Sequence, residues 1–274
     1  MNAPLRPVGD GFDLAGVDPS STPGMDDKAE AERQLADRRD ELDDLQERLW
    51  AESKFGGRRR VLLVLQAMDT AGKGGIVRHV VGGIDPQGVR IYAFKAPTDE
   101  EKAHDFLWRI RNQLPGPGLI GVFDRSHYED VLIHRVRGFS PPDVIEERYG
   151  LITRFEDELA ATGTTLIKVM LHISSEEQKR RLQERLDRPD KHWKFNPGDI
   201  DERELWPQYQ EAYQIALERT STATSPWFVV PADRKWYARW AVQGLLLDAM
   251  RGLDPQWPAA DFDVEEQKAR LAAT

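Results

Sequence analysis

Apolar and polar positions follow two different rhythms along the chain, and each rhythm predicts a different kind of element. Short apolar runs, often β-branched, are typical of buried strands, and five occur, at 61–65, 89–94, 118–123, 164–173 and 226–230. Between them, apolar residues recur every three or four positions, as on one face of a helix. Strands alternating with helices predict a three-layer α/β/α fold with a mostly parallel five-stranded sheet.

Capping residues mark several of the predicted helices. Thr98 and Ser174 are each followed three positions later by glutamate, which is the capping-box pattern. Two prolines at 141–142 can open a helix that Gly163 would end. Because no repeat or linker interrupts the pattern, we predict one domain over residues 26–255.

The two ends of the chain differ from this domain. Residues 1–25 hold four prolines and four glycines with little periodicity, so we expect a flexible N-terminal arm there. Residues 256–274 are expected to form a C-terminal tail. Within 26–53, four leucines share one face of an amphipathic helix, which could cover the body or meet a second subunit: Leu35, Leu42, Leu45 and Leu49.

Composition excludes several classes of protein. The 274 residues are 40% apolar and include no cysteine, so a core can form while disulfides, cysteine nucleophiles and thiolate-bound metals are excluded. The longest apolar run, 61–65, is far shorter than the roughly 20 residues that cross a bilayer. With no apolar leader at the N-terminus, we expect a cytoplasmic protein that binds no membrane.

The net charge of −9 has the wrong sign for a general nucleic-acid binder, so we predict no nucleic-acid partner. A polyanionic ligand would need a local basic site, because salt screens charges over about 8 Å.

A glycine-rich loop, AMDTAGKGG at 67–75, follows the first strand and leads into an apolar helix. This order is typical of a phosphate-binding loop. Backbone N–H groups near Gly72, Gly74 and Gly75 would meet phosphate oxygens, and Lys73 would add a positive charge. The alternative is a plain strand–helix turn with its lysine in solvent.

The loop departs from the usual P-loop motif at two positions. Ala67 stands where the first glycine is expected, and Gly74 replaces the hydroxyl residue that usually binds magnesium. A bound metal would therefore need another ligand, and Asp69 inside the loop is the candidate.

A second carboxylate, Asp124, ends the third predicted strand and is followed by Arg125. This is the Walker B arrangement, in which a strand-end aspartate binds magnesium beside the phosphate loop. The arginine could hold a transferring phosphate or pair with an acid. Alternatively, Asp124 and Ser126 could both cap the helix predicted to begin near His127.

A basic segment is the last candidate. Residues 176–194 hold seven Lys or Arg and five acids, in a chain that is acidic overall. Arg181 and Arg185 share a helix face, and Lys191 and Lys194 flank a tryptophan in the loop that follows. The segment could be a solvated face. In a phosphate-loop fold it could instead form a lid, at about 176–202, that excludes water.

Together these segments resemble the polyphosphate kinase 2 family, the polyphosphate:nucleotide phosphotransferases, over roughly residues 30–255. The resemblance rests on AMDTAGKGG at 67–75, FKAPTDEEKAHDFLWR at 94–109, FDRSHYEDVL at 123–132, EEQKRRLQERLDRPDKHWKFNPGD at 176–199 and PADRKW at 231–236. It implies a P-loop kinase-like fold with a helical lid and reversible phosphoryl transfer between inorganic polyphosphate and nucleotides. It also implies Mg²⁺, which Mn²⁺ could replace, and a homo-oligomer, either a dimer or a tetramer.

The resemblance also implies roles for individual residues. Asp69 and Lys73 match the Walker A acid and lysine, and Asp124 and Arg125 match the Walker B pair. The four basic lid residues, Arg181, Arg185, Lys191 and Lys194, would face polyphosphate. The spelling DRSHYE is similar to the subgroup that accepts both AMP and ADP, which links Glu129 to acceptor choice. Lys95, at a predicted strand end, could reach a nucleotide phosphate.

Two competing functions remain at the level of sequence. A nucleoside monophosphate kinase of the thymidylate-kinase type would share the fold but use ATP as donor. A nucleotide-binding or polyphosphate-sensing protein without turnover is disfavoured by Asp69 and Asp124, because binding an anion calls for cations rather than carboxylates.

Overall fold

Five parallel strands form the central sheet of the structure, a computed structural model in which residues 5–274 are described. Their order across the sheet is β2-β3-β1-β4-β5. Each strand coincides with one of the predicted apolar runs, so the predicted α/β fold is confirmed. The strands are β1 (Arg60–Ala67), β2 (Val89–Ala93), β3 (Ile120–Asp124), β4 (Thr164–His172) and β5 (Trp227–Pro231).

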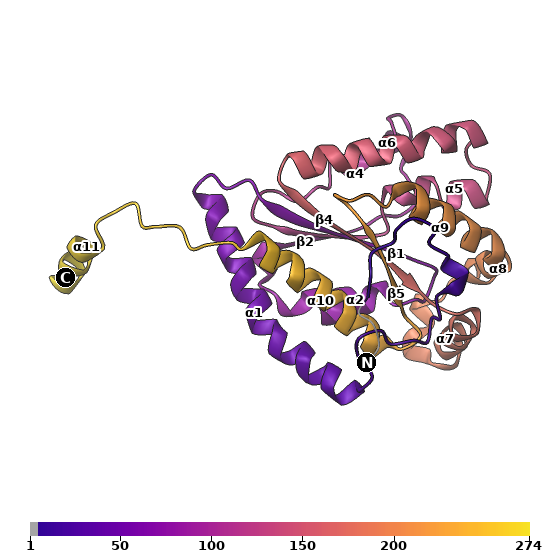
Figure 1. The fold of residues 1–274 in the computed structure, drawn as a ribbon, viewed down its shortest axis with the longest axis horizontal. Coiled ribbons are helices and arrows are strands. Elements are labelled where there is room, and N and C mark those ends of the chain that lie inside the picture. The colour runs from indigo at the N-terminus through magenta and orange to yellow at the C-terminus, as the bar shows by residue number, and fades with distance from the viewer. Residues whose placement is uncertain (1–4) are drawn as a thin grey trace.

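Helices cover both faces of the sheet (Figure 1). On one face lie α2 (Lys73–His79) and α10 (Lys235–Leu253), with α1 (Lys28–Lys54) packed on the outside of α10. On the other face lie α6 (Pro142–Ala161) and α9 (Trp206–Thr220). Every residue of β1 after the first is buried, as expected for the central strand of a doubly covered parallel sheet.

The remaining helices lie in the connections and at the C-terminus. They are α3 (Asp99–Lys102), α4 (Trp108–Arg111), α5 (Ile133–Val136), α7 (Ser175–Asp187), α8 (Gly198–Glu204) and α11 (Val264–Ala272). Short 3-10 helices are η1 (Leu14–Gly16), η2 (Val81–Gly83), η3 (Pro86–Gly88), η4 (His127–Asp130) and η5 (Pro189–Lys194). Among the helices described, none is long and apolar enough to cross a membrane.

Both predicted N-caps form, but only one of the two predicted capping boxes is complete. Thr98 forms a complete capping box with Glu101 at the start of α3. Ser174 caps α7, where its hydroxyl accepts a hydrogen bond from the Glu177 N–H at 3.1 Å. The helix opened by the two prolines ends at Ala161, and Gly163 follows with φ +89°.

The apolar face of α1 is used within the chain. Leu42, Leu45 and Leu49 are buried, and the helix packs along α10. Of the two roles predicted for this helix, the structure therefore shows the first, a cover for the body.

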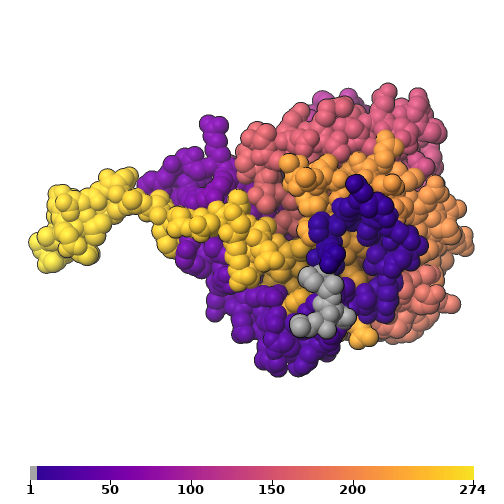
Figure 2. All heavy atoms as spheres, viewed as in Figure 1, coloured from indigo at the N-terminus to yellow at the C-terminus, as the bar shows by residue number. Residues whose placement is uncertain are grey.

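The N-terminal segment is held more closely than the predicted flexible arm. In Figure 2 it lies across the body, over α9 and α10. The Val8 N–H donates to the Trp227 carbonyl at 2.8 Å, and the Gln214 side chain bonds the backbone of Phe12 and Leu14 at 2.7 and 2.8 Å. Val8 and Leu14 are buried. A few apolar side chains and satisfied backbone groups thus fix residues 5–25, although the segment lacks periodicity.

The C-terminal tail, by contrast, leaves the body. After Asp254 the chain runs away from the sheet and ends in α11, which stands apart from the other elements (Figure 1). Apolar side chains of the tail are exposed, with Phe262 at 57% and Leu271 at 76%.

Candidate phosphate-binding site

The predicted phosphate loop joins β1 to α2 at the carboxyl edge of the sheet. The helix begins at Lys73, so the two glycines that follow this lysine lie in its first turn. Gly72 has φ +122°, a backbone conformation that residues with a Cβ atom rarely adopt. The Lys73 amine donates to the Ala67 carbonyl at 3.1 Å, which holds it over the loop.

Asp124 and Arg125 reach the same edge from β3. Asp124 is in register with Leu65 of β1, the neighbouring strand. Arg125 follows in a left-handed conformation, φ +65°, and its guanidinium donates to Asp69 Oδ1 at 2.8 Å. The helix cap is supplied by Ser126, whose hydroxyl accepts from the Tyr128 N–H at 3.2 Å. That cap opens a 3-10 turn rather than the predicted helix.

Burial and neighbouring charges together shift the pKa values of Arg125 and Glu129. Burial alone would lower the pKa of Arg125, but the carboxylates of Glu129 and Asp69 outweigh it and raise that pKa. Burial raises the pKa of Glu129, against the opposing effect of Arg125 and Lys73. Glu129 therefore lies within electrostatic reach of Lys73 and Arg125.

A cavity of about 520 Å³ opens over the loop, and Asp69, Lys73, Asp124 and Arg125 all line it. Nine Lys or Arg residues line this cavity against three acids, in a protein whose net charge is −9. Such a concentration of positive charge favours an anionic ligand. The local basic site that the composition required is therefore present at the phosphate loop.

Arg181, predicted to face polyphosphate, lines the cavity, while its guanidinium is bound to protein groups. It is 4% exposed, and each of its five N–H groups has a protein partner. Two bond the carbonyls of Thr70 and Ala71 in the phosphate loop, at 3.0 and 2.9 Å. Two more bond the carbonyls of Ala232 and Asp233 after β5. Arg181 thus holds the loop against the segment that follows β5.

The other basic lid residues are less enclosed. Arg185 donates to the Lys194 carbonyl at 2.9 Å and pairs with Asp199 Oδ2 at 3.3 Å. Lys191 and Lys194 line the cavity from η5, beside the 78% exposed Trp193. Both lysines therefore add positive charge to the lining of the cavity.

Sequence reasoning missed four further basic residues of the cavity. Arg78 and His79 end α2, and Lys235 and Arg239 lie one turn apart on α10. Burial lowers the pKa of Lys235, and burial with nearby Arg239 and Arg78 lowers that of His79. The i, i+4 spacing of Lys235 and Arg239 was a usable signal, but the packing of α10 beside α2 was not visible in the sequence.

The two residues linked to the nucleotide stand apart from this set. Lys95 is exposed just beyond β2, and its carbonyl accepts from Arg109 at 2.9 Å. Neither Lys95 nor Glu129 is among the described residues that line the cavity. Both are nevertheless at the carboxyl edge, on the β2–β3 side of the loop.

The acids of the site suit a hard divalent cation that is shared with substrate. Asp69 and Asp124 line one cavity, and both are partly exposed. Within residues 5–274 no group of three or more metal-binding side chains occurs. Two carboxylates fit Mg²⁺, which is usually bound by one or two carboxylates, water and phosphate oxygens rather than by a full protein cage.

Sequence comparison connects this site to known enzymes. The profile of the polyphosphate kinase 2 family matches residues 25–258. An AMP/ADP-polyphosphate phosphotransferase of Meiothermus ruber is 47% identical over 256 residues, which cover 93% of this chain and 94% of that protein. An ADP-polyphosphate phosphotransferase of Rhodopseudomonas palustris is 43% identical over 233 residues, covering 79% of this chain and 78% of that protein.

Solved structures agree with this similarity. The crystal structure of polyphosphate kinase 2 from Arthrobacter aurescens TC1 superposes with a TM-score of 0.96 at 59% identity, covering 98% of this chain and 95% of that one. A putative polyphosphate kinase 2 from Pseudomonas aeruginosa superposes with a TM-score of 0.80 at 33% identity, covering 87% of this chain and 50% of that one.

Proposed function

Because the chain belongs to the polyphosphate kinase 2 family, we propose that it transfers a terminal phosphoryl group reversibly between inorganic polyphosphate and nucleotides. AMP and ADP are the proposed acceptors, giving ADP and ATP. The observation that carries the proposal is one cavity in which a phosphate loop, two carboxylates and cations from α2, α7, η5 and α10 meet.

The spread of positive charge supports a polymer as donor. Lys191 and Lys194 border the phosphate loop on the lid side, while Lys235 and Arg239 border it from α10. A chain of phosphates carries charge along its whole length, so cations on both sides of the loop would each meet part of it. The thymidylate-kinase type, with ATP as donor, needs charge only around a triphosphate and is less favoured.

The chemistry needs no strong general base. A phosphate oxygen of the acceptor attacks the terminal phosphorus of polyphosphate, and the bond from that phosphorus to its bridging oxygen breaks. The polymer leaves one phosphate shorter, with the negative charge on its new terminal oxygen. Since the acceptor is already anionic, positioning and charge neutralisation dominate catalysis.

Residues of the site would supply both of these effects. Lys73 holds a positive charge over the loop, and Arg125 reaches toward it from β3. Both would neutralise charge on the reacting phosphates. Asp69 and Asp124 would hold Mg²⁺, or Mn²⁺ in its place, and the metal would neutralise further phosphate charge. Closure of the basic lid over the polymer would exclude water and so disfavour hydrolysis.

Glu129 is the proposed determinant of acceptor choice. It lies four residues after Arg125 and within electrostatic reach of it, on the side of the loop where Lys95 follows β2. The relative from Meiothermus ruber, whose name includes AMP, supports acceptance of both nucleotides.

Turnover with each acceptor tests the proposal. The protein would be incubated with long-chain polyphosphate and Mg²⁺, with AMP or ADP supplied separately, and products resolved by anion exchange. We expect ADP from AMP and ATP from ADP. Conversion of ADP alone would overturn the assignment of Glu129. Failure with both, alongside phosphorylation of AMP by ATP, would replace the proposal with the ordinary kinase.

We also propose a homo-oligomer, a dimer or a tetramer. The support is the detached C-terminal tail, because a nine-residue helix such as α11 is marginal on its own in water and gains stability by packing. Light scattering after size exclusion should give a multiple of the 31.3 kDa chain mass. A single-chain mass at assay concentration would contradict this proposal.

A further inference from the structure

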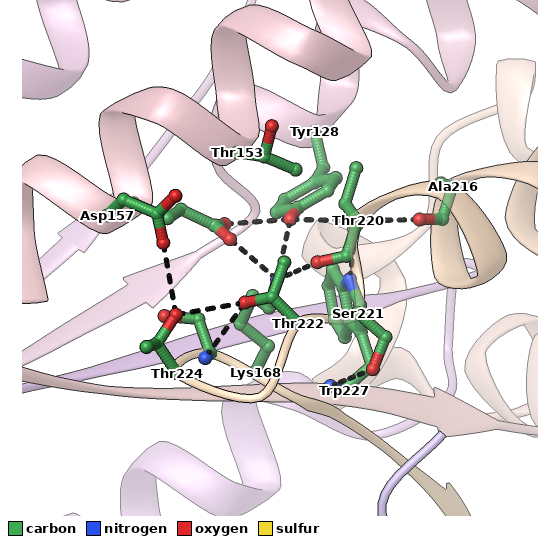
Figure 3. Close-up of polar contacts among 12 residues, drawn as sticks. Tyr128, Thr153, Asp157, Lys168, Ala216, Thr220, Ser221, Thr222, Thr224 and Trp227 are labelled. Atoms are coloured by element: carbon green, nitrogen blue, oxygen red, sulfur yellow. Dashed lines mark hydrogen bonds and ion pairs between the residues drawn. The ribbon is translucent and has the colours of Figure 1, made fainter. Parts of the chain in front are cut away.

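A buried polar cluster joins the turn after β3 to α6, β4 and α9 (Figure 3), and none of its residues lines the cavity. Its members are Tyr128 of η4, Glu156 of α6, Lys168 of β4 and Thr220 at the end of α9. Each is at most 1% exposed. Lysine and glutamate are rarely buried so completely unless they are paired, so the cluster calls for an explanation.

Lys168 lies at the centre of the cluster. Its amine donates to Glu156 Oε2 at 2.6 Å, to Tyr128 Oη at 3.0 Å and to the Thr220 carbonyl at 2.6 Å. These contacts use all three N–H groups of the ammonium. The arrangement ties three elements, α6, α9 and η4, to the strand that carries the lysine.

Glu156 connects the cluster to two consecutive residues of the turn. Its Oε1 atom accepts a hydrogen bond from Tyr128 Oη at 2.7 Å and lies 3.2 Å from His127 Nε2. The hydroxyl of Thr220 lies 3.0 Å from the same tyrosine oxygen and accepts from Trp227 Nε1 at 2.9 Å. Glu156 and Lys168 thus fix the two side chains that follow Ser126.

The turn needs such support. Arg125 has a left-handed backbone, which a residue with a side chain keeps only where its surroundings hold it, and η4 is a single short turn. On the β1 side, the Arg125 N–H donates to the Leu65 carbonyl at 3.0 Å, and the side chains of Gln66 and Ser126 are hydrogen-bonded at 3.0 Å. On the other side, the turn is held through His127 and Tyr128 by the cluster.

Stability alone does not account for a lysine and a glutamate at this place. Replacing a buried ion pair by apolar residues of similar volume is often neutral or stabilising, because the charges no longer need to be desolvated. What directional hydrogen bonds add is a fixed orientation for the groups that they bind.

We propose that Glu156 and Lys168, acting through Tyr128, are positioning residues that aim Arg125 at Asp69 and the reacting phosphates. The inference rests on the proposed role of Arg125 in phosphoryl transfer. The cluster touches no reacting atom, so its loss should lower the rate of the bound complex more than it weakens substrate binding.

The first test is Tyr128→Phe, which removes one hydroxyl and keeps the ring. The matched control is Tyr237→Phe, because the Tyr237 hydroxyl is also buried in a hydrogen bond, to the Pro23 carbonyl at 2.9 Å on the α10 side. We expect kcat to fall about tenfold or more in Tyr128→Phe, as for a misplaced reacting group. The KM for polyphosphate should change by less than about twofold, and the control should keep its kcat. Equal kcat values in the two variants would overturn the proposal.

A double-mutant cycle separates positioning from general weakening. If Tyr128 acts through Arg125, then Tyr128→Phe should lower kcat no further once Arg125→Ala is present. If the two substitutions instead lower kcat by independent factors that multiply in the double variant, the proposal is overturned. Normal turnover of Arg125→Ala alone would instead contradict the proposed role of Arg125, which is a distinguishable outcome.

The double variant Glu156→Leu with Lys168→Met tests the cluster in a form that should still fold. It removes both charges together, so neither is left buried without a partner. We expect thermal unfolding close to that of the parent protein with a lowered kcat and little change in the KM for polyphosphate. Parent-level kcat in this double variant would show that the polar cluster has no positioning role.

Discussion

Lys73 and Arg181 serve the same loop in different ways. The Lys73 amine has one hydrogen-bond acceptor among the described residues, the Ala67 carbonyl, and it lines the cavity. Two of its N–H groups are thus available to a phosphate. Arg181 has none available, because protein groups occupy all five. We therefore propose that Lys73 binds the ligand and that Arg181 fixes the shape of the loop.

Replacing Lys73 should abolish most of the activity without unfolding the protein. In Lys73→Met the charge over the loop is lost, and we expect turnover with ADP and polyphosphate to fall by about 10²–10³-fold. Lys268→Met, on exposed α11, is the matched control and should keep parent turnover. The check is initial rates for both variants alongside their melting temperatures. Near-parent activity of Lys73→Met would remove it from the site.

His134 should make stability depend on pH between about 6.5 and 4. Burial lowers its pKa from 6.5 to about 4, and the charges of Arg148 and Arg109 add to the effect. In this range the unfolded chain binds a proton that the folded chain does not. The contribution is therefore fully present above pH 6.5 and lost as the pH falls toward 4.

The contribution of His134 to the free energy of unfolding is about 2 kcal/mol, after allowance for its partial exposure. Replacing it by glutamine should flatten the acid limb of a plot of unfolding free energy against pH, measured by urea titration. The control is His104→Gln, at an exposed position. An unchanged acid limb in His134→Gln would contradict the assignment.

At the scale of elements, the lid and the loop should separate in their kinetics. Lys191→Ala with Lys194→Ala removes two amines of η5 at the cavity. We expect the KM for polyphosphate to rise about tenfold or more, while the KM for ADP changes by less than about twofold. Steady-state kinetics with each substrate varied would check this. Equal changes for both substrates would contradict a lid that binds the polymer.

Arg181→Ala should behave differently, because it leaves the carbonyls of two loops without their donors. We expect a loss of about 2–3 kcal/mol in the free energy of unfolding together with weaker use of both substrates. A stable variant with only polyphosphate binding impaired would restore the predicted role of Arg181 in the lid.

For the whole molecule, the two ends of the chain should contribute unequally. Deleting residues 1–25 removes the buried side chains of Val8 and Leu14 and exposes part of β5 and α9. We expect about 4 kcal/mol of lost stability, or roughly 10 °C in melting temperature. Deleting residues 255–274 removes a segment of similar size that stands off the body of its own chain, and it serves as the control when all proteins are melted at a concentration where the parent is a single chain. Equal melting temperatures for the two truncations would contradict the packed N-terminal segment.

The fold was accessible from the sequence because each strand is buried on both faces and appears as an uninterrupted apolar run. The phosphate loop and the Asp124–Arg125 pair were accessible because each follows directly from a strand end. What the sequence could not reveal depends on contacts between distant segments. Arg78 and Arg239 meet at one cavity only through the packing of α2 against α10.

Arg181 shows the same limit within one helix. Its spacing from Arg185 places both on one face, but the direction of each guanidinium depends on the carbonyls nearby. The N-terminal segment is another case. Its prolines and glycines are typical of a flexible arm. The residues that hold it in place, such as Gln214, come close to it only in the folded protein.

Transfer of label from the polymer shows directly whether polyphosphate donates the phosphoryl group. Polyphosphate made from ³²P would be mixed with unlabelled ADP, Mg²⁺ and the protein, and nucleotides separated by chromatography. We expect ³²P in the γ-phosphate of ATP, with one labelled ATP for each phosphate lost from the polymer. Release of the label only as inorganic phosphate, or nucleotides that stay unlabelled while ADP is not consumed, would contradict polyphosphate as the donor.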